Sequence, residues 1–301
     1  MSAVEATRES DRSLPQVCYE ESVVRVGTPV PLNGVLTNSR LGKGAQSALC
    51  VVMLNSGLLH HVGTCGLSVR LARSLANLGI PSVRFDFSGI GDSPPRRSSG
   101  DYRDRMDAEV IEIMDHAQQA TGAQMFILFG LCSGAFGSFT AAQKDHRVVG
   151  VIQIAPHSFR TPKWYLNHYA AKLRRVPRFL RRLVQKVQPD EKSTTPDAVD
   201  VIQYEVDSDS EPTRAEISGG YAKLLGRGVR FLVLMTQGES ETYNYQGQMR
   251  EMLPDIEFGD YLEEHFFPRT RHIITEPEDQ QQIVQLMVDW CGRHLGPRPN
   301  G

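Results

Sequence analysis

Hydrophobic positions along the chain form short apolar runs separated by longer amphipathic stretches. The runs predict buried strands of a parallel sheet, and the stretches predict helices packed on it. Strands that alternate with helices in this way indicate an α/β fold with a parallel, doubly wound sheet and right-handed crossovers. We expect strands at 22–26, 31–37, 47–54, 81–87, 125–130, 148–154 and 229–236, the first two as a hairpin, and helices at about 65–79, 102–119, 133–144 and 277–294.

The alternation breaks between residues 157 and 212, where prolines, basic clusters and an acidic, serine-rich stretch replace the regular pattern. We interpret this segment as a helical cap or lid inserted into a core formed by 21–156 and 213–301. Residues 1–20 are mainly polar and predict a flexible N-terminal arm. A chain of 301 residues is long enough for one such α/β domain with an insertion.

Composition and net charge limit the classes of function that the sequence supports. The net charge of −2 gives no reason to expect binding to nucleic acid or to an anionic membrane. The polar N-terminus resembles no secretory signal, and no stretch approaches the roughly 20 apolar residues of a membrane span. Five cysteines, an odd number, favour reduced thiols and a cytoplasmic location. Because neither C-x-x-C nor H-x-x-x-H occurs, we expect no metal and no cofactor.

The segment Gly130-Leu131-Cys132-Ser133-Gly134 lies between a predicted strand and a predicted helix. Its pattern is that of a nucleophile elbow, in which flanking glycines leave room for a strained backbone at the central residue. A thiol there faces a helix N-terminus, which favours the thiolate. The alternative is that the glycines only make a tight turn and Cys132 is a small buried residue. Ser133 competes as nucleophile, but the glycines bracket Cys132 symmetrically, so Ser133 is expected to supply a backbone N–H to an oxyanion hole.

Two further segments complete a resemblance to the α/β-hydrolase superfamily. One is Asn55-Ser56-Gly57-Leu58, directly after a strand, and the other is the D-x-x-G-x-G-x-S turn from Asp86 to Ser93. The nearest group is that of the bacterial exosortase-associated and serine-aminopeptidase-like hydrolases, in which an elbow of the form G-L-C-S-G-A also occurs. The resemblance implies an α/β-hydrolase fold over most of the chain after residue 40. It also implies an oxyanion hole formed by backbone N–H groups of Ser133 and of Gly57 or Leu58.

The superfamily orders its catalytic triad as nucleophile, acid and histidine. The acid should follow the strand at 229–236, where Glu239 is preferred and Glu241 is the alternative. His272, shortly before the last helix, is the expected base, with His265 as the runner-up. His60 and His61 precede the nucleophile, and the chain order argues against either as the base.

These assignments predict a hydrolase of esters or thioesters that works through a covalent acyl-enzyme on Cys132. An acyltransferase or a cyclising thioesterase is the first alternative, because a thioester intermediate also reacts with amines, alcohols and thiols. A non-catalytic binding protein on the same fold is the second. The expected partner is a small acyl substrate, either free or bound to coenzyme A or to a carrier protein. The basic stretch 172–186 either forms a solvated lid face or attracts such an anionic donor through Arg178, Arg181 and Arg182.

Overall fold

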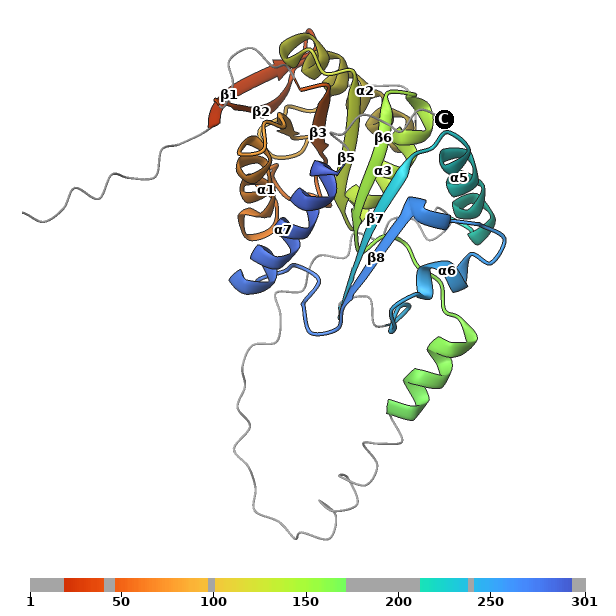
Figure 1. The fold of residues 1–301 in the computed structure, drawn as a ribbon. Coiled ribbons are helices and arrows are strands. Elements are labelled where there is room, and N and C mark those ends of the chain that lie inside the picture. Colours follow the sequence, from red (N-terminus) through yellow and green to blue (C-terminus); the bar gives the residue numbers. More distant parts are fainter. Residues whose placement is uncertain (1–18, 41–46, 97–100, 172–211, 238–240, 294–301) are drawn as a thin grey trace, which may run out of the picture.

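A computed structural model describes residues 19–40, 47–96, 101–171, 212–237 and 241–293. Its centre is one eight-stranded sheet with the strand order β1-β2-β4-β3-β5-β6-β7-β8 (Figure 1). The pairs β1–β2 and β2–β4 are antiparallel, and all other neighbours are parallel. The strands are β1 (Tyr19–Val26), β2 (Leu32–Ser39), β3 (Leu49–Met53), β4 (Ser82–Phe85), β5 (Met125–Leu131), β6 (Val148–Ile154), β7 (Arg230–Thr236) and β8 (Leu262–Phe267).

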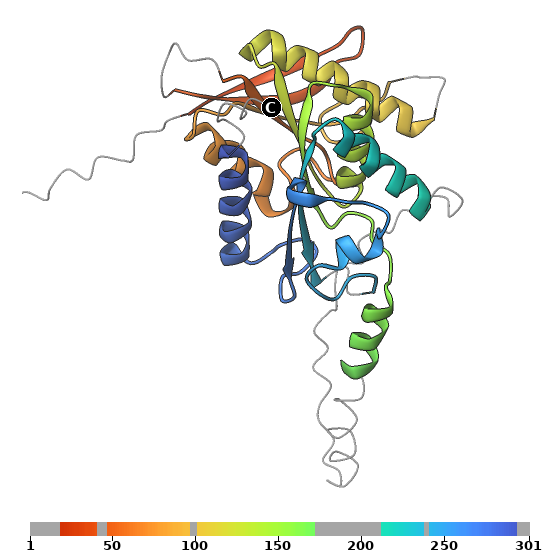
Figure 2. The same cartoon turned by 45° about the vertical axis from the view of Figure 1, so that its right-hand side comes forward.

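Helices cover both faces of the sheet, as Figures 1 and 2 show from two directions. One face is covered by α1 and α7, and the other by α2, α3 and α5. The doubly wound α/β architecture predicted from the sequence is thereby confirmed. The helices are α1 (Leu67–Ala76), α2 (Tyr102–Thr121), α3 (Ser133–Lys144), α5 (Arg214–Gly226), α6 (Gln248–Met252) and α7 (Pro277–Gly292), with short 3₁₀ turns at Thr64–Gly66 and Gly259–Tyr261.

The strand β5 shows why its sequence is apolar without interruption. Successive side chains of a strand point to opposite faces, and both faces of this central strand are buried. Phe126 and Leu128 pack into the core beneath α2 and α3, whereas Ile127 and Phe129 pack into the core beneath α1 and α7. A polar side chain would be buried on either face. The strand therefore lacks the alternation of apolar and polar residues that marks a half-exposed strand.

The N-terminal hairpin is confirmed, but its strands are longer than predicted. β1 begins at Tyr19, inside the arm expected for residues 1–20, and Val23 pairs with Val35 across the hairpin. The part of that arm before Tyr19 lies outside the described residues.

Three regular elements outside the predicted insertion were missed from the sequence, namely β8, α5 and the short helix α6. β8 reads Leu-Glu-Glu-His-Phe-Phe and is an edge strand beside β7, so its polar side chains stay partly exposed and no apolar run marks it. α5 starts at a capping box in which Thr213 and Glu216 bind each other's backbone N–H groups. That T-x-x-E spacing was a readable signal at the edge of the predicted insertion.

The predicted insertion at 157–212 is described only in part. Residues 162–171 are helical and extend away from the sheet beyond the carboxyl end of β6 (Figures 1 and 2). Trp164 in this helix is 3% exposed. Residues 172–211 lie outside the described part, and the assignment as a cap stays a prediction. Among the helices that the structure describes, none has the length and apolar character needed to cross a bilayer.

Candidate active site

Cys132 occupies a sharp turn between β5 and α3. Its backbone has φ 55° and ψ −118°, which is sparsely populated by residues other than glycine, and its side chain is exposed. The turn is held from both sides, because the Cys132 N–H donates to the Ile154 carbonyl and the Cys132 carbonyl accepts from the Ala135 N–H, each at 2.9 Å. Strain of this kind costs about 1–3 kcal/mol and persists only where the surroundings impose it.

The two glycines of the elbow are required by close backbone contacts. A Cβ atom at Gly130 would overlap the carbonyl of Gly134, and a Cβ atom at Gly134 would overlap the carbonyl of Asn55. The first contact lets the strand turn directly into the helix. The second brings the start of α3 against the loop that follows β3.

That loop carries the residues expected to form the oxyanion hole. Gly57 has φ 53°, and its N–H donates to Ser133 Oγ at 2.7 Å. The structure therefore brings Gly57 and Ser133 together, from positions 76 residues apart. Leu58, the residue of the alternative donor, is 56% exposed.

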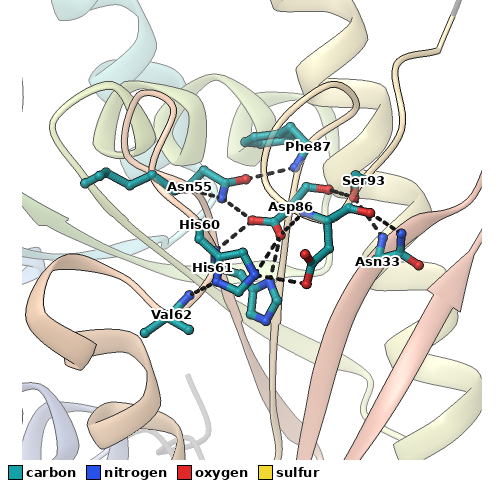
Figure 3. Close-up of polar contacts among 10 residues, drawn as sticks. Asn33, Asn55, His60, His61, Val62, Asp86, Phe87 and Ser93 are labelled. Atoms are coloured by element: carbon teal, nitrogen blue, oxygen red, sulfur yellow. Dashed lines mark hydrogen bonds and ion pairs between the residues drawn. The ribbon is translucent and has the colours of Figure 1, made fainter. Parts of the chain in front are cut away.

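A buried carboxylate supports the same loop (Figure 3). Asp86 is fully buried, and its Oδ1 accepts from Asn55 Nδ2 at 2.8 Å and from the His61 N–H at 2.7 Å. Its Oδ2 accepts from the Asp92 N–H at 3.0 Å and lies 2.8 Å from His61 Nδ1. Burial by itself would raise the pKa of the Asp86 carboxyl, but the hydrogen bonds from His61, Asp92 and Asn55 outweigh burial and lower that pKa.

Asn55 extends this connection to the D-x-x-G-x-G-x-S turn. Its Oδ1 accepts from the Phe87 N–H at 2.8 Å, while its Nδ2 also donates to the Leu59 carbonyl at 2.7 Å. In the turn itself, Ser93 Oγ donates to the Asp86 carbonyl at 2.6 Å. The motif thus holds Asp86 beneath the loop after β3, a role that its sequence pattern did not show.

Exposure separates Cys132 from the two buried thiols of the core. Cys50 and Cys291 are buried, and this burial raises the pKa of each thiol to about 12. Neither can supply a thiolate near neutral pH. Cys132 and Cys65 are both exposed, and of these two only Cys132 lies at a strand-to-helix elbow.

The expected base, His272, and the alternative acid, Glu241, lie on loops that follow strands on the same side of β5. His272 is half-buried in the turn between β8 and α7. Gln237, directly after β7, donates its N–H to the Thr270 carbonyl at 2.8 Å, which ties the loop expected to carry the acid to the segment carrying His272. His265, the runner-up, lies on β8 with Nε2 at 3.1 Å from Glu263 Oε1.

Of the two candidate acids, the structure describes only Glu241. Glu239 lies outside the described residues. Glu241 is exposed, and its carbonyl accepts from Arg160 Nε at 2.7 Å. The basic residues proposed to bind an anionic donor, Arg178, Arg181 and Arg182, also lie outside the described part of the chain.

Comparison with protein families gives one match, to the family described as serine aminopeptidase, S33, over residues 46–222. This match contains the loop after β3, the Asp86 turn and the elbow. No curated protein matches the chain.

Several solved structures share the fold at low sequence identity. An α/β serine hydrolase without a lid from Xanthomonas campestris is 16% identical, with a TM-score of 0.54 and coverage of 95% of this chain and 99% of that one. Est1E from Butyrivibrio proteoclasticus is 13% identical, with a TM-score of 0.57 and coverage of 91% and 98%. A cold-adapted esterase from an Arctic intertidal metagenomic library is 12% identical, with a TM-score of 0.54 and coverage of 95% and 98%. At these identities the likeness is one of fold.

Proposed function

This chain belongs to the S33 serine aminopeptidase family of α/β-hydrolases, and we propose that it hydrolyses esters or thioesters with Cys132 as its nucleophile. The observation that carries the proposal is the backbone of Cys132, at φ 55° and ψ −118° between β5 and α3. This conformation exposes the side chain at the carboxyl edge of the sheet, where the loops after β3, β7 and β8 also begin. A cysteine that served only as a small core residue would be buried, as Cys50 and Cys291 are.

In the proposed reaction, His272 removes the proton from Cys132 Sγ, and the sulfur attacks the acyl carbon. Backbone N–H groups of Ser133 and of Gly57 or Leu58 stabilise the negative charge on the acyl oxygen. The intermediate then expels the alcohol or thiol, which takes the proton from His272, and a thioester remains on Cys132. Water attacks this thioester with His272 as base, which releases the carboxylic acid and restores the thiol.

The contact between Gly57 and Ser133 bears on this scheme. The Gly57 N–H donates to Ser133 Oγ, so an oxyanion that used this N–H would replace the serine hydroxyl. Ser133 would then rotate its side chain while its backbone N–H stays at the start of α3. The hydroxyl contributes no bond to the acyl group in this proposal.

The sulfur also supports a second function. A thioester intermediate transfers its acyl group to amines, alcohols or thiols as well as to water, which makes this chain a candidate acyltransferase. We further propose that Arg178, Arg181 and Arg182 attract a donor bound to coenzyme A or to a carrier protein. Analysis of the products with and without an acceptor amine distinguishes acyl transfer, which gives an amide, from hydrolysis, which gives the free acid.

Intact-mass spectrometry of the full chain tests the nucleophile. After incubation with p-nitrophenyl esters and acyl thioesters of N-acetylcysteamine, we expect one acyl adduct per chain. The adduct should be lost in Cys132→Ala and kept in Ser133→Ala, with Cys65→Ala as the control for the other thiol that is exposed among the described residues. An adduct that survives Cys132→Ala but disappears in Ser133→Ala would overturn the assignment. The absence of any adduct or turnover would favour a binding protein on this fold.

A further inference from the structure

Two histidines and two aspartates meet where the loop that carries Gly57 contacts the turn after β4. Figure 3 shows His60, His61 and Asp86 of this cluster. His60 and His61 lie on the loop after β3, and Asp86 and Asp92 lie on the turn after β4. One nitrogen or oxygen atom from each of the four side chains lies within 4.8 Å of the others. We propose that these side chains bind a divalent transition-metal ion, with Zn²⁺ as the best match to two imidazoles and two carboxylates.

The spacing of these atoms approaches that of a tetrahedral site. With zinc bonded to nitrogen and oxygen at about 2.0–2.2 Å, neighbouring ligand atoms lie about 3.3 Å apart. The contacts are 2.8 Å from His61 Nδ1 to Asp86 Oδ2, 3.4 Å from His60 Nε2 to Asp86 Oδ2 and 3.1 Å from His60 Nε2 to Asp92 Oδ2. The wider pairs can close by rotation of His60 and Asp92, whose side chains are 38% and 68% exposed.

The charges at this cluster also favour a cation. Asp86 is fully buried, and within the described part of the chain its ion pairs are only with His60 and His61. Asp92 likewise forms its ion pair with His60. When both histidines are neutral, two carboxylate charges face each other across His60 Nε2. A divalent ion at this point would balance both charges.

The carboxylate of Asp86 is already oriented as metal ligands usually are. Its Oδ1 accepts from Asn55 Nδ2 and the His61 N–H, which directs Oδ2 toward the two imidazole rings. Hydrogen bonds of this kind fix the geometry of ligating groups in metal sites. The Asp92 N–H also reaches Oδ2, at 3.0 Å. On the solvent side, the exposed His60 and Asp92 leave a path by which an ion could enter.

Such an ion would join the loop after β3 to the turn after β4. Both loops are now connected by hydrogen bonds through Asp86 and Asn55. Metal–ligand bonds would add a stronger link a few residues from Gly57. We therefore expect bound metal to raise the thermal unfolding temperature of the chain, whether or not Cys132 is present.

Titration with Co²⁺ and Zn²⁺ tests the site directly. In the full chain and in Cys132→Ala, we expect one Co²⁺ per chain, with visible d–d absorption and no thiolate charge-transfer band. Zn²⁺ should displace the Co²⁺, and calorimetry should show binding weakened at least about tenfold by His60→Gln and by Asp92→Asn. Both substitutions are at exposed side chains, whereas Asp86 is avoided because the turn depends on it.

The matched control is His146→Gln, which changes an exposed histidine outside the cluster and should leave metal binding unchanged. Three results would overturn the proposal. The first is that no metal binds at one ion per chain. The second is that His60→Gln and Asp92→Asn leave metal binding unchanged. The third is a thiolate charge-transfer band, which would place the metal on a cysteine. In each case the cluster would be a hydrogen-bonded network only. None of these readouts depends on hydrolytic activity.

Discussion

At the scale of single residues, the elbow depends on the absence of side chains at two positions. Gly130 and Gly134 let a strand, a helix and the loop after β3 approach one another at backbone distance. Cys132 lies between them in a conformation that few residues adopt. The sequence pattern of five residues predicted this arrangement because glycine is the only residue that fits both contacts.

Gly134→Ala should therefore damage both stability and activity. The added methyl group meets the Asn55 carbonyl and would push the loop after β3 away from α3. We expect the free energy of unfolding to fall by about 1–3 kcal/mol, as for other overpacked sites. Urea unfolding and kcat/KM for a p-nitrophenyl ester measure the two effects.

Gly219→Ala in α5 is the matched control for this substitution. A Cβ atom at Gly219 meets nothing within 4 Å, so alanine should stabilise the helix by up to about 1 kcal/mol. If Gly134→Ala behaved like Gly219→Ala, close packing between α3 and the loop after β3 would not be required.

At the scale of elements, the loop after β3 and the turn after β4 are joined by side-chain hydrogen bonds rather than by backbone hydrogen bonds between strands. Asp86 and Asn55 bind backbone N–H groups on both segments. The D-x-x-G-x-G-x-S motif could be recognised from the sequence. Its partners could not, since Asn55 and His61 come from a different loop.

The stability contributed by Asp86 should depend on pH in a defined direction. Its pKa is lower in the folded chain than the ordinary value of about 3.9. The carboxylate therefore stabilises the fold at neutral pH, and this contribution is lost as the pH falls below about 4 and through the folded pKa.

Asp86→Asn tests this dependence by comparison of unfolding free energies across pH. At pH 7 we expect a loss of about 2–4 kcal/mol, because an amide group would face the donors that now bind the carboxylate. The difference from the unsubstituted chain should shrink below about pH 4. Asp255→Asn, at an exposed position, should show no such difference. A gap that stayed constant down to pH 2 would contradict the role given to the ionised carboxylate.

At the scale of the whole molecule, parallel strands bring the carboxyl ends of β3, β5, β7 and β8 to one edge of the sheet. The loops after these strands carry Gly57, Cys132, Glu241 and His272. Residues far apart in the chain thus belong to one region because the strand order places them there.

The identity of the base is tested at this scale, since two histidines compete for it. His272→Ala should lower kcat/KM by at least about 10³-fold, as removal of a triad histidine does elsewhere. His265→Ala should change it by less than about tenfold, because His265 lies on β8 and is paired with Glu263. Reversal of these two results would move the base to His265. Glu239→Gln and Glu241→Gln, measured in the same assay, identify the acid.

The sequence by itself determined the α/β architecture and the strand-to-helix turn at Cys132, and it predicted the order of the proposed nucleophile and base along the chain. These features depend on local patterns: apolar runs buried on two faces, glycines at fixed spacing, and strands followed by loops. β8 was not predicted because an edge strand buries too little surface to need an apolar run. The contact of Gly57 with Ser133 and the cluster of His60, His61, Asp86 and Asp92 were decided only by the tertiary structure. Their members lie on separate loops, and no spacing along one segment records which loops the sheet brings together.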